Sequence, residues 1–599
     1  MSTQPKALSL LDPSCHGASC FKFPVDCHSP KVGPGPKNGC GMLPTDPYMP
    51  LFRAYEGDDV QVRVLAGAYT SMHDFTLHGM KWLFEPFNKN SGYRSSQFVI
   101  LSEHYEFLFK MPPVAPGQPK QTTADYIYNP SASFEGLVNG TWGILRSYRS
   151  DAPNLARLPN NPTPSPAATA ISVPGGTPKC SGTAVVQPVS EPPCLREFNV
   201  IAESAREAFG DSNGLVYNSR GAQTTAIPAG GAPSPVPNPT FGNNPLYDPD
   251  ALVYVLADSN GKPIPPKNPE PLVLRANAGD WIKIKLTNHI HSTDPVFNTD
   301  QKVARVDQYT SGYNQFPVKT STSVGLHPQL VGFDVTRANG MNAGLNPVQT
   351  AEPGEPVEYL WYAGDLQYVD GKWIAEPMEL GAINLMPSDP LSQVYHGLFG
   401  SLVIEPKGST WRADTDYRAS GTVFPANGAP FREFVLMAQD DINMLVNGNS
   451  FYKSGAGNGL SAFNYRSEPF AYRFGTFMNN AMGSVAPAKW GDLSETDLTN
   501  IGNFQFSSID TTLAASDTLV GADPQTPVFR APGGIPVRFR LVDPGGIGDN
   551  QQVFELTGHV WEEEPFQQNF DGAWTQPSLA TQRNHGRLRP NVALQHSDR

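Results

Sequence analysis

The chain has 599 residues, enough for several domains with sizeable cores, and a formal net charge of -13 at pH 7. This charge argues against nucleic acid as a partner and allows cations or cationic surfaces. No apolar run approaches the roughly 20 residues of a membrane span. The 55 glycines, the 59 prolines and a charged fraction of only 17% indicate a protein rich in turns and long loops.

Residues 1–49 are rich in cysteine, proline and glycine and show little periodicity, which predicts an irregular lead-in. This segment holds four of the six cysteines, namely Cys15, Cys20, Cys27 and Cys40. The even count favours disulfides, and His16 and His28 leave a metal cluster as the alternative. The pairing of these four cysteines stays open.

The other two cysteines, Cys180 and Cys194, flank a short Pro/Ser/Val stretch, and we expect them to form a disulfide that closes a small loop. Disulfides form in oxidising compartments, so this cysteine usage indicates an extracellular or periplasmic protein. The first residues, MSTQPKALSLLDPSC, lack the apolar core of a signal peptide. We therefore expect either that the export signal is missing from this chain or that the protein is not exported by that route.

Three segments share a proline, an arginine, a glycine and an alternating apolar run, and they begin at Pro50, Pro271 and Pro527. Their runs VQVRV, IKIKL and VRFRL have the period of two that is typical of a strand with one buried face. A second stretch also recurs, because Phe75–Phe87 and Phe554–Phe566 are identical at seven of thirteen positions. Repeats of this kind predict three copies of one β domain.

In chain order, the first unit spans residues 50–150 and closes with GTWGILRSY, before a linker at residues 151–194 that is crowded with small and polar residues. The second unit spans residues 195–410, opens with LREFNVIA and closes with GLFGSLVIEP. The third unit spans residues 431–570 and opens with FREFVLMA. It is predicted to be incomplete because no closing strand precedes the irregular tail at residues 571–599. The expected fold class is all-β, with three tandem Greek-key β-sandwiches and long loops.

Several phrases of the sequence carry a family resemblance. They are the His-x-x-x-x-His-Gly run at His73–Gly79, the WYAGD strand, the GLFGSLVIEP close, and the VGLHPQLVGFDVTRANGMNAGLNPVQT and LHG-x-x-W-x-x-EP stretches. They resemble multicopper oxidases, and most closely the large bacterial manganese-oxidising kind, over most of residues 50–570. The resemblance implies cupredoxin-like sandwiches, copper as cofactor, divalent metal ions or small reductants as substrates, and assembly with further cupredoxin domains or subunits.

Enzymes of that family take electrons at one copper held by a cysteine and two histidines, and pass them to a three-copper cluster held by eight histidines. Their His-x-x-His-x-His cluster is matched here by His73, Thr76 and His78. In the third unit the corresponding positions are Gln552, Glu555 and Thr557, and His559 follows two residues later. The resemblance thus implies that most ligand positions of this cluster have changed.

The remaining ligand positions are also incomplete. A paired histidine would lie near Gly325 and His327, so one imidazole of that pair is kept, and the WYAGD strand has no histidine. No His-Cys-His sequence occurs in the chain, and its counterpart in the first unit is near Asn129. His327 and His396 belong to different predicted strands of the second unit and could converge on one metal.

The candidate copper ligands are therefore His73, His78, His327 and His396. His73 and His78 are five residues apart, which puts them on opposite faces of a straight strand. Two separate sites, or two ordinary core imidazoles, remain alternatives to a shared ion. A lone hydrogen-bonded histidine is the alternative for the other two.

Two interpretations of the function follow. The chain is a copper-dependent oxidase of metal ions such as Mn(II), or a subunit or fragment of one, whose missing ligands come from other sequence. Alternatively, it is a catalytically inactive array of cupredoxin-like sandwiches that serves as a structural or binding protein. A nucleophile elbow, a P-loop and a dinucleotide fingerprint are all absent from the sequence.

Overall fold

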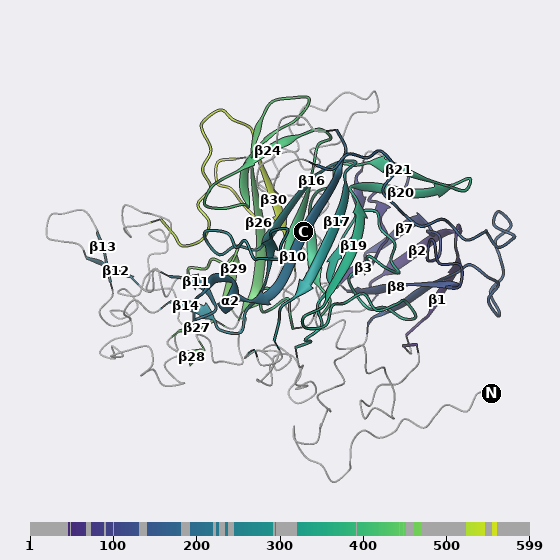
Figure 1. Cartoon of the computed structure of the whole chain (residues 1–599), viewed down its shortest axis with the longest axis horizontal. Coiled ribbons are helices and arrows are strands. Elements are labelled where there is room, and N and C mark those ends of the chain that lie inside the picture. Colours follow the sequence, from purple (N-terminus) through teal and green to yellow (C-terminus); the bar gives the residue numbers. More distant parts are fainter. Residues whose placement is uncertain are drawn as a thin grey trace, which may run out of the picture.

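The computed structural model describes residues 46–544 and 554–559, with gaps inside the first range (Figure 1). The gaps are residues 48, 68–72, 89–90, 100, 131–140, 181–191, 220–222, 227–233, 238–244, 292–293, 295–319, 391, 443, 447–448, 451–459 and 470–522. Nearly all the regular structure described is β-strand, and helix α2 (Ala205–Phe209) is short. No helix in the described residues combines the length and apolar character needed to cross a membrane.

The first unit contains a five-stranded sheet and a two-stranded sheet that share one core. The five-stranded sheet has the order β1 (Phe52–Tyr55), β9 (Gly143–Tyr148), β8 (Thr123–Pro130), β3 (His73–Leu77) and β6 (Ser96–Val99). The other sheet pairs β2 (Asp59–Leu65) with β7 (His104–Lys110). Val60, Val62 and Val64 of β2 pack on this core while the residues between them face solvent. This confirms the alternation predicted for VQVRV.

The second unit is built from two four-stranded sheets around one apolar cluster. One sheet has the order β15 (Leu252–Ala257), β10 (Leu195–Ser204), β17 (Trp281–Asn288) and β19 (Pro356–Tyr362). The other has the order β16 (Leu272–Asn277), β23 (Gly400–Glu405), β22 (Gly381–Pro387) and β18 (Leu326–Pro328). Ile282, Ile284 and Leu286 of the predicted IKIKL strand are fully buried in this cluster, because alternate residues of a strand share one face.

The third unit contributes a sheet that lies beside the second unit in Figure 1. Its strands are β24 (Thr410–Ala413), β25 (Ser420–Phe424), β26 (Phe431–Ile442) and β29 (Leu460–Phe463), and β30 (Val537–Val542) also pairs with β26. Three two-stranded sheets are also described: β4 (Trp82–Leu83) with β5 (Tyr93–Arg94), β12 (Gln223–Ala226) with β13 (Ser234–Pro237), and β20 (Gly364–Val369) with β21 (Lys372–Pro377). A further four-stranded sheet has the order β11 (Leu215–Asn218), β14 (Leu246–Asp248), β27 (Leu445–Val446) and β28 (Asn449–Ser450).

The repeated phrases occupy equivalent places in the sheets. The Pro-anchored strand and the closing strand pair in parallel in the first unit (β1 with β9) and again in the second (β16 with β23). The REF-type opening strand pairs in parallel with the alternating strand in the second unit (β10 with β17) and again in the third (β26 with β30). The predicted fold class, all-β with cupredoxin-like sandwiches, is confirmed.

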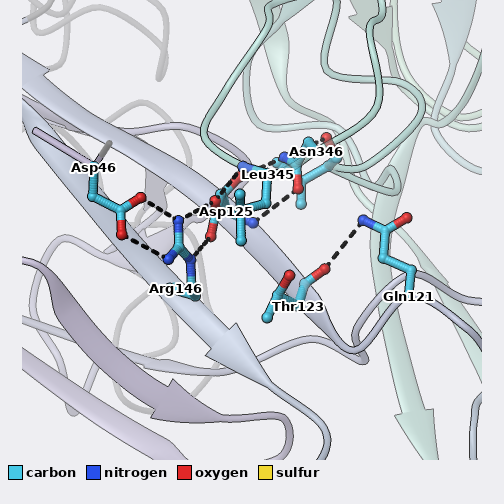
Figure 2. A network of polar contacts seen from close by, with 8 residues as sticks. Asp46, Gln121, Thr123, Asp125, Arg146, Leu345 and Asn346 are labelled. Carbon is cyan, nitrogen blue, oxygen red and sulfur yellow. Dashed lines mark hydrogen bonds and ion pairs between the residues drawn. The ribbon is translucent and has the colours of Figure 1, made fainter. Parts of the chain in front are cut away.

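One buried ion-pair network fastens the first unit to a loop of the second (Figure 2). The Arg146 guanidinium contacts Asp46 and the fully buried Asp125, each through two N–H donors. Asp125 Oδ2 accepts a hydrogen bond of 2.6 Å from the backbone N–H of Leu345. The Asn346 side chain accepts from the Asp125 N–H at 3.0 Å and donates to its carbonyl at 2.8 Å. Strand β8 and the loop after β18 are therefore joined by a backbone N–H bound to a buried carboxylate and by a side-chain amide that pairs with the Asp125 backbone.

A second buried network joins the second and third units. Arg275 of β16 donates to both Glu405 of β23 and Glu433 of β26, and Arg540 of β30 donates to Glu433 at 2.8 Å. Burial would raise the pKa of Glu433, but the two guanidinium groups hold it below its usual value. Burial, followed by the neighbouring Glu433, raises the pKa of Glu405. Because a buried charge is costly unless it is paired, the sheets of these units are held in one relative placement.

Replacing Arg146 with glutamine is expected to lower the free energy of unfolding by about 3–5 kcal/mol, because Asp125 would stay buried without its cation. The matched control is Lys110→Gln, which removes an ion pair whose side chains are 66% and 63% exposed and should cost less than about 1 kcal/mol. Urea unfolding followed by tryptophan fluorescence gives both values. Equal midpoints for the two variants would contradict the role given to this network.

Candidate functional site

A cavity of about 190 Å³ lies where the three units meet. The first unit contributes residues of β3 and β8, the second contributes β18, β22 and the loop after β18, and the third contributes the residues directly after β30. The lining side chains that bear on its chemistry are Thr76, His78, Asn129, His327, Met341, Asn384, Met386 and Asp543. The volume is many times what one water molecule requires, so the cavity has room for a small ligand or a hydrated ion.

Two imidazole rings face each other in this cavity. His78 follows β3 and His327 lies on β18, and their ring centroids are 4.4 Å apart with planes inclined by 22°. His327 Nδ1 lies 2.8 Å from the backbone oxygen of Asn339. A carbonyl oxygen only accepts hydrogen bonds, so Nδ1 carries the proton and Nε2 carries the lone pair. This tautomer leaves Nε2 able to bind a metal ion.

Both rings are neutral at physiological pH. Burial lowers the pKa of His327 to about 4, although its hydrogen bonds to Asn339 act in the opposite direction. Burial, and then the neighbouring His327, lower the pKa of His78 well below its usual value, while a hydrogen bond with the Asn129 side chain acts against them. Neutral imidazole is the form that binds metals, so the site does not have to lose a proton to take an ion.

Several polar atoms around the cavity are buried without a hydrogen-bond partner. They are His78 Nδ1, Thr76 Oγ1 and Asn384 Oδ1. Buried polar atoms in proteins are normally paired, so three such atoms on one cavity indicate a ligand, an ion or ordered water. The thioethers of Met341 and Met386 add soft donors to the same wall. The donor set therefore fits a single ion or a small polar ligand.

The same donor set does not fit a three-copper cluster. Within the described lining of the cavity, only His78 and His327 bring an imidazole, whereas the family resemblance implies eight. Thr76 and Asn129 occupy two of the positions where that resemblance expects histidine or the cysteine strand. Hydroxyl and amide groups are poor replacements for imidazole and thiolate as copper ligands.

The other two predicted ligands lie elsewhere or are only partly described. His396 is buried outside the cavity lining, and its Nδ1 lies 3.2 Å from Asp248 Oδ2. Burial would lower the pKa of His396, but Asp248, together with Asp250 and Asp389, outweighs burial and the pKa is raised. The backbone of His73 begins β3, opposite Val99 of β6, and its side chain falls outside the described residues. The structure thus brings together His78 and His327, and gives His396 a different partner.

The repeat in the third unit has a different environment from the first. Glu555, Thr557 and His559 are exposed, and His559 Nδ1 lies 3.4 Å from the backbone oxygen of Thr557. Trp82 of the first copy, in contrast, is almost fully buried against Phe107. Gln552 and Trp561 lie outside the described residues.

The predicted disulfide between Cys180 and Cys194 is present, with a Cα–Cα distance of 5.3 Å. It is consistent with the oxidising compartment expected from the cysteine count. Cys15, Cys20, Cys27 and Cys40 lie outside the described residues, so their pairing stays a prediction.

Sequence reasoning found each histidine of the cavity but missed their contact. His78 and His327 are far apart in the chain and belong to different units, and no local pattern connects them. Asn384 and Met386 of β22 and Met341 of the loop after β18 were missed altogether, because amide and thioether side chains among apolar residues look like ordinary core residues. The tandem repeat was the signal that could have suggested a junction where the units meet.

No protein-family model and no curated protein matches the chain. Among similar solved structures is a crystal structure of a multicopper oxidase, with 15% sequence identity and a TM-score of 0.21. The match covers 49% of this chain and 65% of the other, so the chain spans less than two thirds of that protein's length.

Acid should destabilise the fold through His327. Its pKa is about 4 when folded and about 6.5 when unfolded, so the unfolded state binds more protons between these values and stability decreases as pH falls. The full effect is about 3 kcal/mol. His327→Asn keeps a donor for the Asn339 carbonyl and does not titrate, so its loss of stability from pH 7 to pH 4 should be smaller. Urea unfolding midpoints of the wild type and the variant, measured at several pH values in this range, give the two losses of stability. If the midpoints of the two proteins decrease equally as pH falls, His327 is not the group responsible.

Proposed function

We propose that this chain is a multicopper-oxidase-like protein that binds one copper ion in the junction cavity and does not reduce oxygen by itself. The observation that carries the proposal is the pair of buried, neutral imidazoles of His78 and His327 in that cavity. The chain is then a binding protein built on sandwiches that the resemblance relates to oxidases. We also propose that the chain divides into three sandwich units at residues 50–150, 195–410 and 431–570.

The ligand atoms of the site follow from the hydrogen bonds. His327 Nε2 is the first ligand, because Nδ1 donates to Asn339. His78 supplies the second through Nδ1, which has no hydrogen-bond partner. Its ring turns out of the stack to do so and gives up its hydrogen bond with the Asn129 side chain. Met341 and Met386 line the same cavity and complete a neutral set of nitrogen and sulfur donors. Such a set favours Cu(I), since thioether and imidazole are soft or borderline ligands.

The second candidate function is a copper-dependent oxidase of metal ions such as Mn(II), or a subunit or fragment of one. The family phrases that recur in order along residues 50–570 favour it. In that case the missing imidazoles and the thiolate come from further cupredoxin domains or a partner chain. An extracellular or periplasmic location suits both candidates, because the Cys180–Cys194 disulfide is stable under oxidising conditions.

Copper titration of the purified protein distinguishes the two functions. We expect about one copper ion per chain at this site and no intense blue absorption, since the cavity offers no thiolate among its described lining residues. His327→Asn should weaken copper binding by more than about tenfold. The control is His104→Asn, because His104 is exposed on β7 and should leave binding unchanged. Several coppers per chain with a strong blue band would favour the oxidase.

Restoring one histidine should not restore an oxidase. Thr76→His places an imidazole at the second position of the first cluster, next to the same cavity. We expect no oxygen consumption with Mn(II) as the electron donor, because the region near Asn129 and the WYAGD strand still lack the metal ligands that the resemblance implies there. Robust turnover by this variant in an oxygen-electrode assay would show that the other ligands are already in place.

A further inference from the structure

A second cluster of possible metal ligands lies away from the junction cavity, at the start of β10. The sulfur atoms of Cys180 and Cys194 and a carboxylate oxygen of Asp280 all lie within 4.8 Å of one another. Cys194 and Asp280 are almost fully buried, and Cys180 is half-buried. The two sulfurs are joined in a disulfide, so the three groups cannot bind an ion in this state.

We propose that reduction of the Cys180–Cys194 disulfide converts this cluster into a binding site for a divalent ion such as Zn²⁺. A dithiol reductant transfers two electrons and two protons to the bond and leaves as its own cyclic disulfide. Zn²⁺ then displaces the two protons from the thiols and binds both thiolates and the Asp280 carboxylate. The half-buried side, at Cys180, leaves the fourth position to water.

The geometry of the cluster suits tetrahedral zinc. Cys194 Sγ is 3.7 Å from Asp280 Oδ1. Zinc–sulfur bonds of about 2.3 Å and zinc–oxygen bonds of about 2.1 Å at a tetrahedral angle separate the two ligand atoms by about 3.6 Å. The carboxylate is held in place by the backbone N–H groups of Cys194 at 3.0 Å and Asn277 at 2.7 Å. Two of the three ligands are therefore already at the spacing that zinc requires.

The backbone keeps Cys180 close after the disulfide is broken. Cys180 donates its N–H to the carbonyl of Leu195 at 3.0 Å, and Leu195 donates to the carbonyl of Pro178 at 2.8 Å. Lys179 forms a parallel bridge with Leu195. These bonds hold residues 178–180 against the start of β10 independently of the sulfur–sulfur bond. The freed Cys180 sulfur then needs only to turn about its own Cα–Cβ bond to face an ion held by Cys194 and Asp280.

The charges at the cluster balance when zinc is present. Arg196 donates to Asp280 and is itself almost fully buried, and its guanidinium lies over the Trp411 ring at 5.0 Å. Two thiolates, one carboxylate, one guanidinium and one Zn²⁺ sum to zero. Two thiolates without the ion would leave two uncompensated negative charges in a buried site, so the thiols stay protonated until zinc arrives.

The test uses the full chain, reduced with a water-soluble phosphine and desalted without oxygen. Equilibrium binding of Zn²⁺ alone should show one more equivalent for the reduced wild type than for reduced C180S/C194S. The oxidised wild type should lack that equivalent. Cd²⁺ in place of Zn²⁺ should give a thiolate-to-metal absorption that the double variant reduces. Because the double variant keeps the four N-terminal cysteines, the difference between the two proteins excludes any ions that those cysteines bind.

If the double variant does not fold, alkylation of the reduced wild-type protein tests the proposal instead. Zinc should slow the reaction of iodoacetamide with Cys180 and Cys194 in the reduced protein by at least tenfold, as mapped by mass spectrometry. Equal alkylation rates with and without zinc would overturn the proposal. So would equal zinc equivalents in the reduced wild type and a folded C180S/C194S.

Discussion

The contact of Arg146 with Asp125 is the interaction on which the placement of the junction cavity depends. Asp125 is fully buried on β8, and the same residue holds the loop after β18 through the N–H of Leu345 and the side chain of Asn346 (Figure 2). That loop carries Asn339, whose carbonyl fixes the His327 ring, and Met341, which lines the cavity. The Arg146 guanidinium, which neutralises the Asp125 carboxylate in the first unit, thereby sets the orientation of the His327 imidazole in the second.

The loop is also held from within the second unit. Gln349 accepts from the N–H of Asn339 at 2.8 Å and donates to the carbonyl of Val335 at 2.9 Å. The indole N–H of Trp361 donates to the Ala338 carbonyl at 2.9 Å. An irregular segment that is buried must satisfy its backbone groups in this way. His327 is thus held by a rigid surrounding, which is a condition for a precise binding site.

The fold was largely predictable from the sequence, because its signals are local. Alternating runs such as IKIKL determine which residues face the core, and the repeated phrases indicated strands that pair in the same way in different units. The disulfide was predictable from two cysteines on either side of a short loop. The site was not, because its contacts cross between units. The stack of His78 on His327 and the pairing of His396 with Asp248 depend on tertiary placement that no periodicity encodes.

The polarity of the junction cavity is the observation that most favours the proposed binding function. Each buried polar atom without a partner costs about 1–3 kcal/mol. A chain under no requirement to bind a ligand gains stability by replacing such groups with apolar side chains of similar size. Thr76, His78 and Asn384 nevertheless keep partnerless polar atoms beside the thioethers of Met341 and Met386. Ordered water, an ion or a small ligand in the cavity would supply the missing interactions and offset this cost.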